Sequence, residues 1–126
     1  MAHRILSASA VLLGLAVMLG AFGAHALEAS VSAERLQTWE TAVLYHFVHG
    51  LALILCGLAL KQDDTNERLI RAASAFFFAG LLIFSGSLYA LVLTDIEILG
   101  AITPIGGLSF IVGWFTLASY FIKNKS

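Results

Sequence analysis

The sequence predicts an all-α protein: one domain, residues 1–126, folded as a bundle of four membrane-spanning helices. Two observations predict it. Hydrophobic residues make up 60% of the chain and charged residues 12%, whereas a soluble domain has about 45–50% and about 25%. The apolar residues also form four continuous runs, each close to the ~20 residues that a helix needs to cross a bilayer. The runs lack the alternation of a barrel wall, so helices are favoured over strands.

The predicted spans follow these runs in order, at residues 5–27, 41–60, 69–93 and 104–122. Polar segments between them predict loops, with a turn at Asp63–Asn66 and a short amphipathic helix from Ser32 into the second span. Thr103 and Pro104 predict the start of the last helix. Threonine can cap a helix, and proline is tolerated in the first turn because its missing N–H has no partner there.

Lysine and arginine predict the orientation. With four spans, both termini and the middle loop lie on one side of the bilayer. That side holds six of the seven cationic residues: Arg4, Lys61, Arg68, Arg71, Lys123 and Lys125. The positive-inside rule then places both termini in the cytoplasm. Trp39 and Tyr120 are expected near the two membrane boundaries. A cleaved signal peptide ending at Ala24–Ala26 is the alternative, but its 23-residue apolar run exceeds the usual ~7–15.

Composition excludes several classes of protein. The apolar surplus excludes disorder, and a net charge of -1 without a basic face argues against a nucleic-acid partner. The single cysteine, Cys56, excludes a disulfide framework and is expected to pack as a small residue. No nucleotide-binding loop or catalytic motif occurs. The spans carry no carboxylate for proton coupling, so the sequence favours a protein that is not an enzyme.

The most informative feature is a set of polar side chains that the predicted topology places in the outer third of the membrane. His46 and His49 are three residues apart and share a helix face, as do Ser85 and Tyr89, four apart. The full set comprises His25, His46, His49, Ser85, Ser87, Tyr89 and Thr103. Small residues such as Gly106 and Gly113 predict close packing between helices.

Three interpretations of this set stay open. The first is hydrogen bonding between helices, each bond contributing about 0.6 kcal/mol. The second is a binding site for a metal, a haem or a small lipophilic molecule, in which His25, His46 and His49 supply three nitrogens and Glu40 an interfacial oxygen. The third is a pH-sensitive histidine.

Four segments together resemble the YgdD/YwdK family of small bacterial membrane proteins. They are GAFGAHAL at 20–27, WETA at 39–42 with Tyr45, His46 and His49, FSGSLY at 84–89, and ITPIGG at 102–107 followed by Gly113 and Trp114. The resemblance covers nearly the whole chain, although Leu44 and Gly50 stand where members often have Gln and Ala. It implies a multi-pass protein of the bacterial plasma (inner) membrane, of unknown function. It marks Tyr45, Glu40 and Pro104 as motif positions beside the polar set above.

The first functional hypothesis is therefore a structural or accessory membrane subunit without enzymatic activity, with the lipid bilayer around it and a second copy or another membrane protein as its partner. The second is a ligand site built on the three histidines, and the third is a small transporter formed by an oligomer. The sequence specifies no cofactor.

Overall fold

The computed structural model describes residues 1–62 and 66–124, and within them it contains helices and no strands. The helical segments are α1 (Ala2–Phe22) with a π-helical turn η1 (Gly23–Leu27), α2 (Ala33–Gln62), α3 (Glu67–Gly80) with a second π-helical turn η2 (Leu81–Ser85) and α4 (Gly86–Thr94), and α5 (Leu99–Lys123). Each π-helical turn continues its helix. The result is four rods of 26, 30, 28 and 25 residues, long and apolar enough to cross a membrane. The predicted all-α class is confirmed.

The start of the last helix was predicted wrongly. α5 begins at Leu99, and Pro104 lies inside it. Thr103 is not a cap, because its hydroxyl donates to the Leu99 carbonyl one turn back, at 3.3 Å. The chain leaves α4 through Asp95 in the left-handed conformation, with φ of 58°. The apolar Leu99–Ile102 segment then forms an additional helical turn ahead of the proline.

The amphipathic helix that was expected to lead from Ser32 into the second span is the first part of α2. Ser32 caps it, since its hydroxyl accepts the Arg35 backbone N–H at 3.2 Å. The predicted turn over Asp63–Thr65, and Lys125 in the orientation argument, lie outside the described residues.

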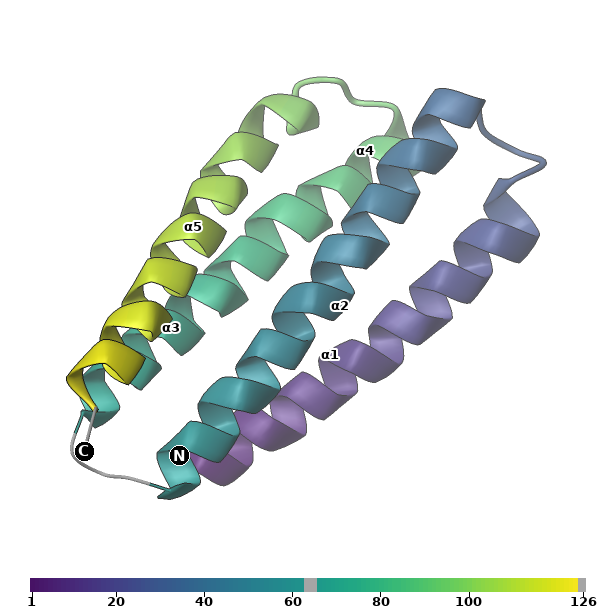
Figure 1. Ribbon diagram of the computed structural model, residues 1–126. Helices are drawn as coiled ribbons and strands as arrows, with labels where there is room; N and C mark the ends of the chain where they lie inside the picture. The colour runs from purple at the N-terminus through teal and green to yellow at the C-terminus, as the bar shows by residue number, and fades with distance from the viewer. Residues whose placement is uncertain (63–65, 125–126) are drawn as a thin grey trace.

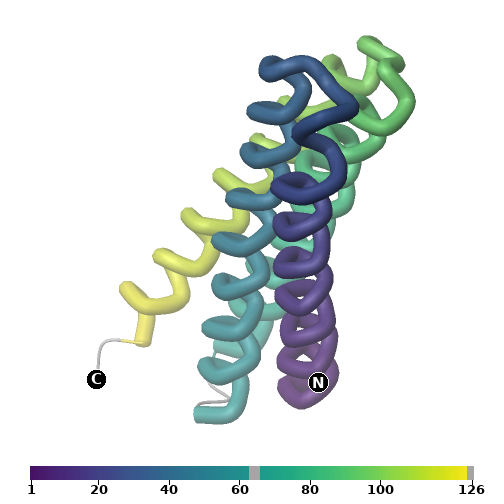
Figure 2. Tube along the Cα trace, turned by 90° about the vertical axis from the view of Figure 1, so that its right-hand side faces the viewer, coloured from purple at the N-terminus to yellow at the C-terminus, as the bar shows by residue number. Residues whose placement is uncertain are grey.

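The four rods run up and down, so that the start of α1, the end of α2, the start of α3 and the end of α5 lie at one end of the bundle (Figure 1). α1 packs along α2, and α2 packs along α3, η2 and α4. α5 packs on α3, η2 and α4 rather than on α2. Figure 2 shows α5, in yellow, diverging from α2 toward its C-terminal end.

Glycines bring α5 close to α3 and η2. A side chain at Gly106 would collide with the backbone of Phe84, and one at Gly113 would lie 2.8 Å from the Phe77 ring. Gly80 of α3 in turn makes room for the ring of Phe110. The predicted packing role of Gly106 and Gly113 is therefore confirmed. Cys56 lies fully buried in the same core, as expected.

Candidate functional site

The structure divides the predicted polar residues into three groups and leaves two of them outside. His46, His49, Ser85, Ser87 and Thr103 are buried, and Tyr89 is half-buried. His25 in η1 and Glu40 on α2 are exposed. One group surrounds His46, between α2 and α4, and a second surrounds His49, between α2 and α5. The third consists of Ser87 and Thr103, between α4 and α5. The predicted set is thus not one cluster.

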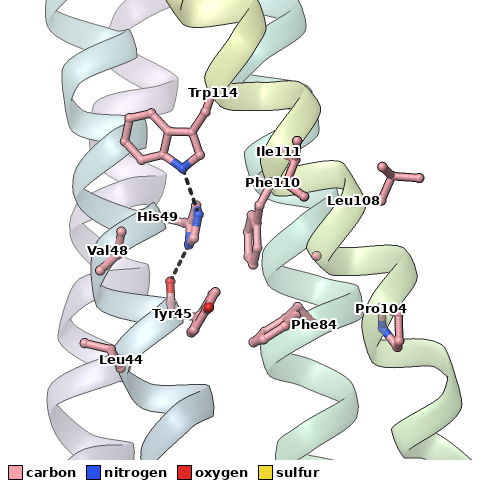
Figure 3. A pocket seen from close by; sticks show the side chains of 11 residues that line it. Leu44, Tyr45, Val48, His49, Phe84, Pro104, Leu108, Phe110, Ile111 and Trp114 are labelled. Carbon is pink, nitrogen blue, oxygen red and sulfur yellow. Dashed lines mark hydrogen bonds between the residues drawn. The ribbon is translucent and has the colours of Figure 1, made fainter.

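His49 connects α2 to α5. Its Nδ1 lies 2.8 Å from the Tyr45 carbonyl oxygen, and the Trp114 indole N–H donates to its Nε2 at 3.1 Å (Figure 3). A carbonyl only accepts and an indole only donates, so the ring is neutral with its hydrogen on Nδ1. The imidazole also stacks on Phe110, with 3.4 Å between ring centres and 10° between planes. Both nitrogens are therefore fully used by the protein.

His46 has one engaged nitrogen and one free nitrogen. Its Nδ1 lies 3.1 Å from the Tyr89 hydroxyl of α4, whereas Nε2 is buried without a hydrogen-bond partner among the described residues. The Ser85 hydroxyl donates to the Ala42 carbonyl of α2 at 2.9 Å. Ser85 and Tyr89 thus both contact α2, as their spacing predicts.

Two further polar contacts stabilise the ends of α4 and α5. The Ser87 and Thr103 hydroxyls lie 2.6 Å apart and join the two helices. Beyond them, the Arg35 guanidinium pairs with the Asp95 carboxylate at 2.7 Å, which ties α2 to the connection between α4 and α5. These contacts support the prediction of hydrogen bonding between helices.

Trp39 and Tyr120, which were expected near the membrane boundaries, lie near the ends of α2 and α5, and both are buried. The Trp39 indole N–H donates to the Leu19 carbonyl of α1 at 2.8 Å. Gly23 makes this possible, because a Cβ there would lie 2.5 Å from the indole ring. The sequence signal for this contact is Gly23, the second glycine of the GAFGAHAL segment.

The three-histidine metal site is a wrong prediction. The part of the chain that the structure describes contains no group of three His, Cys, Asp or Glu residues able to hold a metal. His25 is exposed, His46 contacts α4 and His49 contacts α5. Residues three apart on a helix diverge by about 60°, which is enough here to direct the two imidazoles to different neighbours.

The polar side chains lie at different heights in the bundle. His49 lies about halfway along α2 (Ala33–Gln62) and pairs with Trp114, near the middle of α5 (Leu99–Lys123). The polar side chains therefore extend from one end of the bundle to its middle.

A groove of about 660 Å³ lies between α2 and α5 and is the main candidate site (Figure 3). Its residues come from both helices and from η2: Leu44, Tyr45, Val48, His49, Phe84, Pro104, Gly107, Leu108, Phe110, Ile111 and Trp114. Aliphatic side chains such as Leu44 and Leu108 are exposed at its rim, so the groove opens sideways to the surroundings of the bundle. Trp114 was missed as a site residue, because its partner His49 is 65 positions away in the sequence.

Comparison with known proteins gives the same membrane character. Residues 19–107 match the family described as Protein of unknown function (DUF423). The chain is 46% identical to the UPF0382 membrane protein YwdK of Bacillus subtilis over 110 residues, which cover 86% of this chain and 88% of the relative. It is 48% identical over 103 residues to a UPF0382 membrane protein of Staphylococcus aureus strain bovine RF122, covering 82% of each chain. No solved structure matches.

The family match spans well over half of the chain, and the relatives are similar along most of their length. Together with four helices able to span a membrane, this gives a multi-pass bacterial membrane protein embedded in the lipid bilayer. The resemblance stated from the sequence motifs is confirmed by YwdK itself. The chain belongs to the DUF423 family of proteins of unknown function.

Proposed function

We propose that this protein binds a lipophilic molecule in the groove between α2 and α5. The observation that carries the proposal is the groove of about 660 Å³ that lies between α2 and α5, two helices that do not pack closely on each other. Ligand pockets have volumes of about 300–1,000 Å³ and apolar linings with a few placed polar groups. The groove has this character, with Tyr45 and Trp114 as its polar edges. Its sideways opening lets a hydrocarbon chain enter from the bilayer without crossing water.

A binding role fits the lining better than catalysis. The eleven lining residues include no serine, cysteine or carboxylate that could act as a nucleophile or a proton donor. The one imidazole, His49, is held neutral by the Tyr45 carbonyl and the Trp114 indole. Proton transfer through His49 would break one of these bonds.

The proposal can be tested by fluorescence quenching with 9,10-dibromostearic acid, added to the protein in nanodiscs. Trp114 lines the groove, whereas Trp39 is 1% exposed, so quenching reports on Trp114. We expect quenching that saturates near one probe per protein. Quenching that rises linearly with the probe content of the bilayer would show ordinary lipid contact and contradict the proposal.

A matched pair of variants locates the probe. A Cβ at Gly107 would lie 3.7 Å from the Phe84 ring, which is ordinary contact, so Gly107→Phe places its ring in the groove without a backbone clash. Ile105→Phe adds a ring to the exposed side of the same helix. Saturable quenching should weaken at least tenfold in Gly107→Phe and stay unchanged in Ile105→Phe.

The structural or accessory subunit predicted from the sequence is a second candidate, and the placement of α1 favours it. α1 packs mainly on α2, and only 17% of its most apolar 18-residue stretch is buried inside the protein. Its free face could therefore contact a second copy or another membrane helix. Disulfide cross-linking of Gly14→Cys, at a position with no atom within 4 Å, should give a dimer in native membranes. A monomer under oxidising conditions would exclude contact between copies at this face.

We also propose that both termini face the cytoplasm. The end of the bundle with the termini carries Arg4, Lys61, Arg68, Arg71 and Lys123, and the other end carries Arg35 with Asp95 and Glu97. The positive-inside rule supports this orientation. Fusions of alkaline phosphatase, which is active only outside the cytoplasm, should be inactive at both termini. Activity at either terminus would contradict it.

A further inference from the structure

A smaller hollow, here named the η1–α2 cleft, lies where the first rod ends beside α2. It has a volume of about 290 Å³ and is lined by Gly20, Gly23, Ala24, Trp39, Glu40, Val43, Leu44 and Phe47. The glycines let the two rods approach closely here, since a Cβ at Gly20 would lie 3.4 Å from the Val43 side chain. Leu44 is the one lining residue that the cleft shares with the groove between α2 and α5, so the two are separate sites.

Glu40 is the charged side chain of this cleft. It is exposed, and within the described residues the ion pairs use Arg35 and Arg71, so that the Glu40 carboxylate has neither a cation nor a hydrogen-bond donor. The other polar side chain that lines the cleft is Trp39, whose indole N–H already donates to the Leu19 carbonyl. The Glu40 carboxylate is therefore available to a molecule that enters the cleft.

The position of Glu40 along α2 places it near a membrane boundary. The predicted span begins just after Glu40, whereas α2 begins at Ala33 and is 30 residues long. Such a helix measures about 45 Å, and the hydrocarbon core of a bilayer is about 30 Å thick. With α2 centred in the bilayer, Glu40 lies close to the depth at which the hydrocarbon meets the lipid headgroups. An ionisable side chain at the membrane is costly without a partner and indicates a functional site.

The chemistry of the cleft defines the class of its occupant. An ionised carboxylate only accepts hydrogen bonds, and it forms its strongest ones with a positively charged donor. The remaining wall is apolar and is exposed at Ala24 and Leu44, so a hydrocarbon chain can enter from the bilayer. The volume admits a segment of such a chain, since a cavity of about 150 Å³ holds one benzene ring.

We propose that the η1–α2 cleft binds an aminophospholipid. Its primary ammonium donates to the Glu40 carboxylate, which neutralises that charge at the membrane boundary, while the first part of an acyl chain lies against Val43 and Phe47. Charge complementarity selects the ammonium, and the N–H donors select a primary amine over a trimethylated one.

The headgroup is tested with lipids that differ only in the methylation of the ammonium. Dioleoylphosphatidylethanolamine, its monomethyl and dimethyl derivatives and dioleoylphosphatidylcholine all carry the positive charge, but the last has no N–H donor. Each lipid is titrated into the delipidated full chain in detergent, and bound lipid is counted by native mass spectrometry. We expect one ethanolamine lipid per chain, with a dissociation constant at least fivefold lower than that of the choline lipid. Equal affinities for these lipids, or tighter binding of dioleoylphosphatidylglycerol, which has no ammonium, would overturn the proposal.

A matched pair of carboxylate variants tests the role of Glu40. Glu40→Gln keeps the size of the side chain and removes its charge, so the affinities for the ethanolamine and choline lipids should become equal. Glu34→Gln, at another exposed carboxylate of α2 that does not line the cleft, should keep the wild-type preference. A preference for the ethanolamine lipid that survives in Glu40→Gln would overturn the proposal.

A second pair tests the cleft itself. Ala24→Leu fills the cleft from η1 and should weaken binding of the ethanolamine lipid at least fivefold. Ala21→Leu, at an exposed alanine of α1 outside the cleft, should leave binding unchanged. Circular dichroism checks that each variant keeps its helices. Equal weakening in both variants, or in neither, would place the lipid elsewhere and overturn the proposal.

Discussion

Replacing Trp114 by Phe should weaken the link between α2 and α5 by removing the indole N–H that donates to His49 Nε2 at 3.1 Å. The acceptor lies on a buried ring stacked on Phe110, where no water replaces the lost donor. The smaller ring of phenylalanine should cost little stability by itself. Trp114 is 39% exposed, so lipid contacts replace the contacts that the larger indole ring made.

The expected magnitude follows from the burial of the acceptor. A buried group left unsatisfied costs about 1–3 kcal/mol, which is an upper limit for Trp114→Phe. Hydrogen bonds between membrane helices, measured by double-mutant cycles, average about 0.6 kcal/mol and reach about 1.7. Because the geometry is good and His49 is buried, we expect a coupling energy between His49 and Trp114 of about 1 kcal/mol, in the upper part of that range.

The cycle comprises Trp114→Phe, His49→Phe, the double variant and the wild type. Each free energy of unfolding is measured by titrating sodium dodecyl sulfate into protein held in bicelles. The double variant should be less destabilised than the sum of the two single variants, since one hydrogen bond is counted twice in the sum. A coupling energy of zero within error would refute this reasoning. It would mean that the groove is kept in shape by apolar packing alone.

Further predictions concern two glycines and an ion pair. Gly23→Ala should destabilise the protein by about 1–3 kcal/mol, because its Cβ would lie 2.5 Å from the Trp39 indole. Gly14→Ala, where the added Cβ lies in open space, should instead stabilise the protein by about 0.5–1 kcal/mol. Melting temperatures that shift in the same direction for the two glycine variants would contradict these two predictions. Asp95→Asn should keep the left-handed turn and remove the charge facing Arg35, costing at most about 1 kcal/mol. A larger loss in the detergent titration would contradict that estimate.

The four helices could be predicted from the sequence because each apolar run alone is long enough to cross a bilayer. The start of α5 could not, because the Thr103–Pro104 signal is local and the structure extends the helix back over apolar residues to Leu99. A proline six residues into a helix removes one backbone hydrogen bond near its end. The Thr103 hydroxyl, which is hydrogen-bonded to the Ser87 hydroxyl, adds a contact between α5 and α4 in that region.

The sequence indicates which polar side chains belong to the candidate site, but not which helices those side chains connect. The spacing of His46 and His49 indicates that both lie on one face of α2, and in the structure both are buried. It does not indicate which helix each one faces, because that depends on the order of the helices around α2. The contact of His49 with Trp114 joins residues 65 positions apart, and no local periodicity contains that information.

The groove follows from the sizes of the side chains on the two faces of α5. On the face toward α3 and η2, Gly106 and Gly113 let the helices approach until Phe84 and Phe77 touch the α5 backbone. On the face toward α2, aromatic rings intervene, and the His49 imidazole is stacked on Phe110. Glycines on one side and rings on the other hold α5 against the α3–η2 rod and away from α2. In the described part of the chain, α2 and α5 are joined by one hydrogen bond, between His49 and Trp114. A molecule entering the groove therefore has few contacts to break.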